Sequence, residues 1–85
     1  MDPHDATLQQ LVVNWPAGSV TVHFRTTRGE AVLTAQGLRH LDLQRAAPWG
    51  PSVSVNQVVQ GHGRLAIEMQ SGDVVTIEAD TVSID

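Results

Sequence analysis

The sequence feature that most constrains the fold lies within residues 64–80, where two alternating apolar runs flank a short polar turn. Alternation at a period of two is typical of a strand with one buried face. The apolar positions are odd-numbered on both sides of the turn. Two apolar residues that face each other across the hairpin therefore have residue numbers whose sum is even, which requires a loop with an odd number of residues. We therefore predict a β-hairpin. Its inward side chains are Leu65, Ile67, Met69, Val75, Ile77 and Ala79.

The loop Gln70-Ser71-Gly72 meets this length rule as a type I turn followed by a left-handed glycine in a G1 bulge. The register then sets Ile67 opposite Val75 on the inner face. On the outer face Arg64 lies opposite Glu78, and such an exposed cross-strand ion pair contributes about a few tenths of a kcal/mol. The hairpin defines architecture and indicates no activity by itself.

Size and composition predict one small domain spanning residues 1–85. A chain of this length buries roughly 60–65% of its unfolded surface. With 41% hydrophobic and 16% charged residues, it is too apolar for disorder, and no apolar run is long enough for a membrane span or a signal peptide. It contains no cysteine, which excludes disulfides and thiol chemistry. We expect a cytoplasmic protein of bacterial type with no membrane partner.

The net charge of −4 falls unevenly along the sequence. Up to residue 63 the carboxylates and arginines cancel, whereas beyond it Arg64 stands against five carboxylates. An acidic hairpin repels phosphate backbones, so we expect no nucleic-acid partner. The five carboxylates are Glu68, Asp73, Glu78, Asp80 and Asp85.

Short alternating or valine-rich runs between turn residues recur along the rest of the chain, and no segment has a sustained helical period. Pro16 and Gly18 predict a four-residue loop over 15–18 that aligns Val13 with Val20. Besides the hairpin, the expected strands cover residues 7–15, 20–25, 30–36, 41–45, 52–59 and 80–85. We predict an all-β fold, a small antiparallel β-sandwich or partly open barrel of about six to eight short strands.

Glycine and tryptophan positions refine this pattern. Gly37 is predicted to break or bulge the chain between the third and fourth strands. Trp15 is predicted to close the inner face of the first strand, and Val53 and Val55 to face inward from the fifth. The predicted core is Leu11, Val13, Val20, Val22, Phe24, Leu41, Leu43, Leu65, Ile67, Met69, Val75 and Ile77.

Three segments of the chain carry a resemblance: His4-Asp-Ala-Thr-Leu8, Pro48-Trp-Gly-Pro-Ser52 and Ile67-Glu-Met-Gln-Ser-Gly-Asp73. Together they resemble a group of small uncharacterised bacterial all-β proteins. The resemblance covers nearly the whole chain and implies an all-β fold with no established activity, cofactor or catalytic residue. The opening is also similar to that of some immunity proteins of bacterial toxin systems, which favours a binding role.

Residues that could carry catalytic or metal chemistry are scattered. No G-x-S-x-G motif is present, and the glycines fall singly at turns rather than in a phosphate-binding loop. The histidines lie on different predicted elements, without the paired spacing of zinc or iron sites. They are His4, His23, His40 and His62. We therefore predict a non-enzymatic protein with no cofactor and no metal.

Glu68, Glu78 and Asp80 are the predicted binding residues. They are even-numbered, so they stand on the solvent side when the apolar residues face inward. A charged sheet face can serve solubility alone, but this one gathers the negative charge of the chain and would steer a basic partner. We predict a protein-binding module, similar to an immunity protein or antitoxin, that is a monomer or weak dimer. Its partner would be a protein with an Arg/Lys-rich cleft, such as a nuclease.

Trp49 supports an alternative prediction. Because it lies between Pro48 and Pro51, its side chain either anchors its loop in the core or stands out as a rigid contact surface. In the second case the protein is a small-ligand or carbohydrate-binding β domain that stacks its ligand on Trp49. The exposure of this side chain separates the two possibilities.

Overall fold

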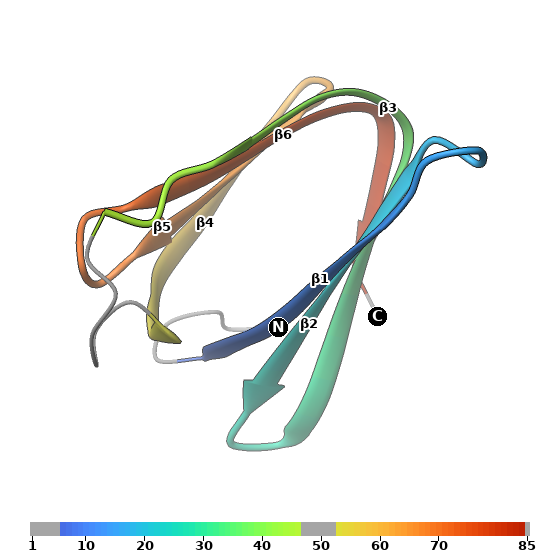
Figure 1. Cartoon of the computed structure of the whole chain (residues 1–85). Helices are drawn as coiled ribbons and strands as arrows, with labels where there is room; N and C mark the ends of the chain where they lie inside the picture. The colour runs from blue at the N-terminus through green and yellow to red at the C-terminus, as the bar shows by residue number, and fades with distance from the viewer. Residues whose placement is uncertain (1–5, 47–52, 85) are drawn as a thin grey trace.

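The computed structural model describes residues 6–46 and 53–84, which form β-strands joined by short turns. The strands are β1 (Thr7–Asn14), β2 (Ser19–Thr26), β3 (Gly29–Leu43), β4 (Val55–Gly61), β5 (Arg64–Met69) and β6 (Val74–Ile84). All neighbouring strands are antiparallel, and they make one sheet in the order β1-β2-β3-β6-β5-β4 (Figure 1). No helix that could cross a membrane occurs in this part of the chain. The predicted all-β class is confirmed.

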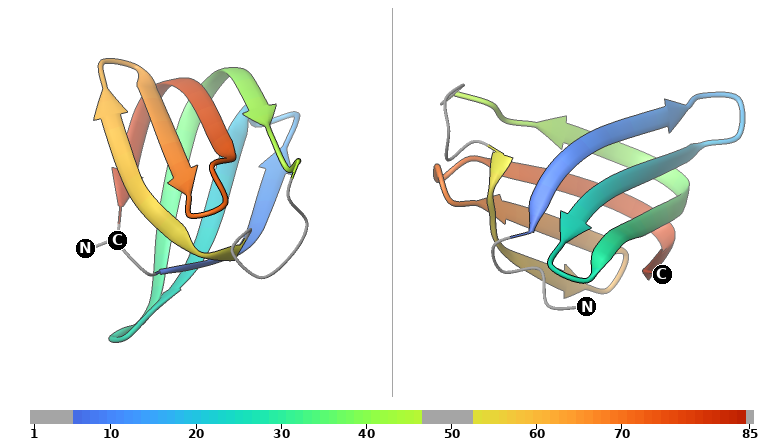
Figure 2. Two further views of the ribbon diagram at one scale, coloured as in Figure 1. Left: turned by 90° about the vertical axis from the view of Figure 1, so that its left-hand side faces the viewer. Right: turned by 90° about the horizontal axis from the view of Figure 1, so that it is seen from below.

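The sheet bends sharply across its two longest strands, β3 and β6, so that its two halves face each other (Figure 1, Figure 2). β3 pairs with β2 over residues 29–36 and with β6 over residues 33–43, and thus belongs to both halves. One half holds β1, β2, the start of β3 and the end of β6. The other holds β4, β5 and the first part of β6 with the end of β3. The inner faces enclose the core.

The two edge strands of the sheet, β1 and β4, meet at one end only. Thr7 of β1 forms an isolated bridge with Ser54, and the amide of Val55 donates a hydrogen bond to the carbonyl of Ala6 at 2.8 Å. Elsewhere in the described residues β1 and β4 do not pair, so the sheet is not closed into a barrel. Of the two predicted architectures, the partly open barrel describes it better.

The β5–β6 hairpin has the predicted register, with Ile67 opposite Val75. Its three-residue loop is closed by two backbone hydrogen bonds. The amide of Met69 donates to the carbonyl of Asp73 at 2.8 Å, and the amide of Gly72 donates to the carbonyl of Met69 at 2.9 Å. Gly72 has a φ of 94°, the left-handed conformation that the parity of the loop required.

Replacing Gly72 by valine should destabilise the protein by at least about 1 kcal/mol, because a β-branched side chain is disfavoured at positive φ. Apart from the two neighbours in the chain, no heavy atom of the described residues lies within 4 Å of an added Cβ at this position, so the backbone conformation accounts for the loss. Thermal unfolding measures it as a fall in Tm of about 4–8 °C. An unchanged Tm would show that the loop does not need its left-handed residue.

The β1–β2 hairpin has its predicted loop but not its predicted burial. Val13 lies opposite Val20, and the four-residue loop covers 15–18. Yet Val13 is 44% exposed and Trp15 is 84% exposed, so the core positions predicted for both were wrong. The tip of this hairpin extends past the opposite half of the sheet (Figure 1), in agreement with the exposure of Val13 and Trp15. Leu43, the last residue of β3, is likewise 56% exposed at the open end of the sheet.

At two positions where the sequence predicts a break between strands, the structure has one continuous strand. The segments expected at 30–36 and 41–45 form the single strand β3, in which Gly37 bends the chain at a φ of 70° rather than ending the strand. Likewise, the short strand expected at 80–85 continues the hairpin as β6. A bulge follows the bend in β3. The bend and the bulge together change which residues point inward, so that apolar side chains of β3 face the core in both halves of the sheet.

Irregularities in the strands also complete the core. A bulge at Asn56 shifts the alternation of β4, so that the fully buried Val55 and the partly buried Val58 both face inward. Val53 is exposed, so its predicted inward position was wrong. Leu33 is fully buried although it lies in an unbroken apolar run. The buried apolar residues are Ala6, Val20, Val22, Phe24, Ala31, Leu33, Ala35, Val55, Leu65, Ile67, Met69, Val75, Ile77 and Ala79.

Candidate protein-binding face

The outer face of β3, β5 and β6 gathers most of the described carboxylates. The register lays the side chains of this face in rows across the strands, because paired residues point to the same side of a sheet. The successive rows are His40–Glu78–Arg64, Asp42–Thr76–Ala66 and Val74–Glu68–Gln57. We call this surface the acidic face, and its carboxylates are those of Asp42, Glu68, Glu78 and Asp80.

Glu78 and Glu68 lie on the same face but not side by side. Glu78 is exposed between Arg64 of β5 and His40 of β3. Glu68 is half-buried, and its Oε1 accepts a hydrogen bond from Nε2 of Gln57 at 2.9 Å. The rows that hold the two glutamates are about 13 Å apart along the strands. The structure therefore presents two separate carboxylates rather than a pair.

Asp80, the third predicted binding residue, lies at the bend of the sheet. Its carboxylate forms an exposed ion pair with the guanidinium of Arg39. The side chain of Asp80 also lies over Gly37, where Cγ and Cβ of Asp80 would be 2.6 and 2.7 Å from an added Cβ. Asp80 thus contributes charge to the acidic face and also fills the space at the bend.

Asp73, which the sequence counts among the hairpin's charges, is buried rather than displayed. Its Oδ1 accepts a hydrogen bond from the amide of Ala46 at 3.1 Å, and its Oδ2 accepts one from the hydroxyl of Ser71 at 3.2 Å. The carboxylate therefore ties the chain leaving β3 to the β5–β6 turn. Asp85 lies outside the described residues. The surface of the hairpin therefore displays fewer negative charges than its sequence contains.

An asymmetry of charge nevertheless distinguishes the two outer faces of the sheet. The acidic face carries four carboxylates against Arg39 and Arg64, a net charge of −2 with histidine neutral. On the outer face of the other half, Arg25 lies opposite Glu30 and the two charges cancel. Apart from Glu30 and the buried Asp73, every carboxylate in residues 6–46 and 53–84 lies on the acidic face.

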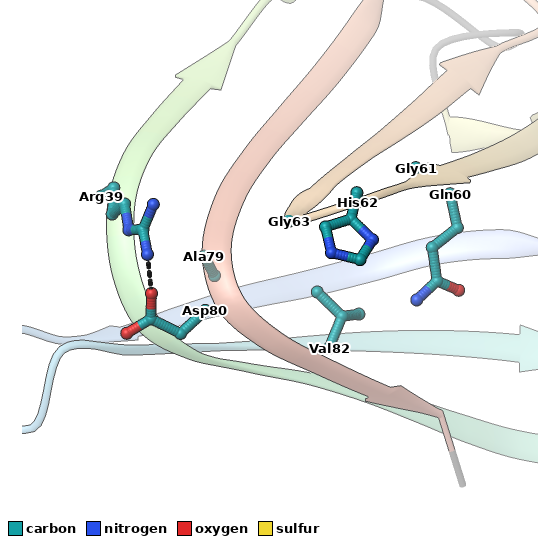
Figure 3. Close-up of a pocket in the computed structure, with 8 residues that line it drawn as sticks. All are labelled: Arg39, Gln60, Gly61, His62, Gly63, Ala79, Asp80 and Val82. Carbon is teal, nitrogen blue, oxygen red and sulfur yellow. Dashed lines mark hydrogen bonds and ion pairs between the residues drawn. The ribbon is translucent and has the colours of Figure 1, made fainter.

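An open pocket of about 410 Å³ adjoins this face at the bend. Figure 3 shows the ion pair of Arg39 and Asp80 on one side of the β6 ribbon, with His62 and Gln60 on the other, beside Val82. These side chains offer hydrogen-bond donors and acceptors to a polar group. Within the described ranges, no three His, Cys, Asp or Glu side chains come together in a way that could hold a metal ion.

A more apolar cavity of about 330 Å³ opens between β1 and the end of β3. We call it the β1 groove. Leu8 and Leu11 line it from β1, and both face inward because a bulge separates them in the strand. Its other apolar lining residues are Leu43, Val53, Met69 and Val75.

Trp15 is the prominent surface residue that the sequence pattern assigned to the interior. The amide of Gly18 donates to the carbonyl of Trp15 at 3.1 Å, and the amide of Ala17 donates to Oδ1 of Asn14 at 3.2 Å. These bonds close the turn that carries the exposed indole. The signal that could have located it is the Trp-Pro-Ala-Gly turn itself, because turns lie on the surface. Trp49 lies outside the described residues, so the alternative function stays a prediction.

Comparison with known proteins bears on the fold and indicates no activity. No protein-family model matches the sequence, and no curated protein matches it significantly. Among solved structures, the chain is similar to an uncharacterized protein from Neisseria gonorrhoeae, with a TM-score of 0.65 and 13% sequence identity. The likeness covers 96% of this chain and 91% of that one. At this level of identity the likeness shows a shared fold alone.

Proposed function

We propose that this protein is a non-enzymatic protein-binding domain that docks a basic partner protein on the acidic face. The supporting observation is the placement of charge, because one outer face holds nearly all displayed carboxylates of the described chain while the other is balanced. Asp42, Glu78 and Asp80 are exposed, and Glu68 is half-buried. Such a face steers a cationic partner into contact and sets its orientation.

The two arginines on the acidic face, Arg39 and Arg64, limit where a partner's cationic side chains can bind. Arg64 lies opposite Glu78, and Arg39 is paired with Asp80, so two of the four carboxylates have an arginine as a neighbour. A partner must therefore present spaced Arg or Lys side chains that meet Asp42, Glu68 and Glu78. A protein cleft that binds nucleic-acid phosphates has this chemistry, since carboxylates can take the place of phosphates opposite its cations. The role we propose is that of an immunity-like or antitoxin-like inhibitor of a nuclease.

Replacing Asp42 by asparagine and both Glu68 and Glu78 by glutamine tests this proposal. The wild-type protein is used to capture partners from an extract of its native host, and each captured protein is then purified and titrated. We expect the triple variant to bind its partner about tenfold or more weakly at low salt, with a flatter salt dependence. Asp80 is left unchanged because it also packs at the bend.

Replacing Glu30 by glutamine provides the matched control, because it removes a carboxylate from the opposite outer face. This variant should bind the captured partner as the wild type does, and circular dichroism should show that all variants are folded. Equal affinity of the triple variant and the wild type would mean that the acidic face is only a solvated surface.

A further inference from the structure

In the described part of the chain, β1 leaves one edge of the sheet unpaired beyond Thr7, and its residues from Gln10 to Asn14 carry none of the charges, prolines or bulges that usually protect such an edge. Among residues 6–46 and 53–84, β1 pairs with β2 on one side and meets the opposite edge of the sheet only at Thr7. Natural proteins protect such edges with charged residues, proline or bulges. The eight residues of β1, Thr-Leu-Gln-Gln-Leu-Val-Val-Asn, contain no charge and no proline. The bulge after Leu8 leaves a regular stretch from Gln10 to Asn14.

Apolar side chains are displayed along this same stretch. Val12 and Val13 are each 44% exposed, and Trp15 directly follows the strand with 84% of its surface exposed. The turn that carries Trp15 is held from its other end as well, because the amide of Leu38 donates to the carbonyl of Gly18 at 2.9 Å. An aromatic side chain on a turn fixed in this way loses little backbone entropy on binding, which is the property of an interface anchor.

The β1 groove lies toward the opposite end of the strand from Trp15. Gln9, Gln10 and Leu11 line it together with Leu8. One edge of the molecule therefore carries both an exposed indole and an apolar cavity, separated along a single strand. A self-complementary arrangement of this kind is what a two-fold symmetric interface requires, because each copy supplies the same two parts.

We propose that two copies of this chain pair antiparallel through their β1 edges, with each Trp15 seated at the β1 groove of the other copy. A two-fold axis at Val12 places Leu11 opposite the partner's Val13. It also brings Trp15 beside the partner's Gln9, where the groove begins. The absence of charge on β1 means that the two identical edges do not repel each other. This interface is separate from the acidic face and does not rest on its function.

The size of the contact predicts a weak, concentration-dependent dimer. Each indole contributes roughly 150–250 Å², and the five-residue ladder adds backbone hydrogen bonds and the two exposed valines. The total lies at the low end of specific interfaces, which bury about 1,200–2,000 Å². The dimer should therefore dissociate on dilution.

Sedimentation velocity over a wide concentration series tests the proposal. The wild-type protein should shift from monomer to dimer as concentration rises. Val12→Lys should stay monomeric, because the two-fold axis sets the two lysines against each other, and Trp15→Ala should also stay monomeric because its anchor is lost. The matched control is Val59→Lys, which charges a similarly exposed valine (47%) on the other edge strand, β4; it should dimerise as the wild type does.

The position of the indole is tested by fluorescence in a Trp49→Phe background, where Trp15 is the sole tryptophan. Its emission should move to shorter wavelength as the dimer forms. A wild-type protein that is monomeric throughout would overturn the proposal, as would a dimer that Val59→Lys disrupts and Val12→Lys does not. A dimer whose Trp15 emission stays that of an exposed indole would overturn the seating of Trp15 at the groove.

Discussion

Replacing Phe24 by alanine should lower the free energy of unfolding by about 3–5 kcal/mol. Phe24 is the only phenylalanine of the chain and is completely buried on the inner face of β2. Its removal takes apolar area out of the core and leaves a cavity that the sheet can fill only in part. A domain of this length has a total stability of roughly 4–13 kcal/mol, so the variant should be close to unfolding. Urea denaturation followed by circular dichroism measures the loss.

Trp15→Ala is the matched control for Phe24→Ala, because it removes an aromatic side chain that the structure exposes. Its effect on the stability of the monomer should stay within about 0.5 kcal/mol. The two measurements are made at a concentration where the protein is monomeric. Equal losses in the two variants would contradict the assignment of one aromatic residue to the core and the other to the surface.

Replacing Gly37 by alanine should destabilise the protein by about 2–5 kcal/mol. Two effects add at this position. The φ of 70° lies in the left-handed region, which costs a residue with a Cβ about 1–2 kcal/mol. In addition, the new methyl group would overlap Cγ and Cβ of Asp80, so the bend in β3 or β6 would have to open. Thermal unfolding by calorimetry measures the sum.

Gly63→Ala separates these two effects. Gly63 has the same φ of 70°, but the nearest atom to an added Cβ is the carbonyl oxygen of Ala79 at 3.4 Å, an ordinary contact distance. This variant should therefore lose only the backbone contribution of about 1–2 kcal/mol. If Gly37→Ala were no more destabilising than Gly63→Ala, the close packing of Asp80 over the bend would be disproved.

The hairpins could be predicted from the sequence because their determinants are local. The parity of apolar positions and the length of the loop fix which residues face each other. This is why Ile67 lies opposite Val75 and Val13 opposite Val20 as expected. Parity fixes only the side of the sheet on which a residue lies. Whether the opposite half covers that side depends on strands far away in the sequence, and this explains the wrong placement of Trp15.

The bend could not be predicted, because it depends on a contact between distant segments. Gly37 alone is compatible with a break, a bulge or a bend. The bend is defined by the packing of Asp80 over Gly37 and by the continuation of β6 alongside β3. The interruption in the alternation of side chains therefore looked like a boundary between two strands.

The candidate site was predictable in outline but not in detail. Even-numbered positions correctly indicated that Glu68 and Glu78 share one face of the hairpin. The neighbours that moderate their charge come from other strands, such as Gln57 beside Glu68. The burial of Asp73 also depends on a distant group, the amide of Ala46. A count of charges along the sequence therefore overstated the negative potential of the hairpin.

The membership of β3 in both halves of the sheet has a consequence for folding during synthesis. The other strand pairs join neighbours along the chain, so their loops are short and close quickly. The pairing of β3 with β6 forms later, because it joins residues as far apart as Leu33 and Ile84. The entropy cost of closing this long loop comes before the strand contacts that offset it. While β6 is still inside the ribosome, one edge of β3 has no strand beside it. The nascent chain is therefore most prone to aggregation in that interval.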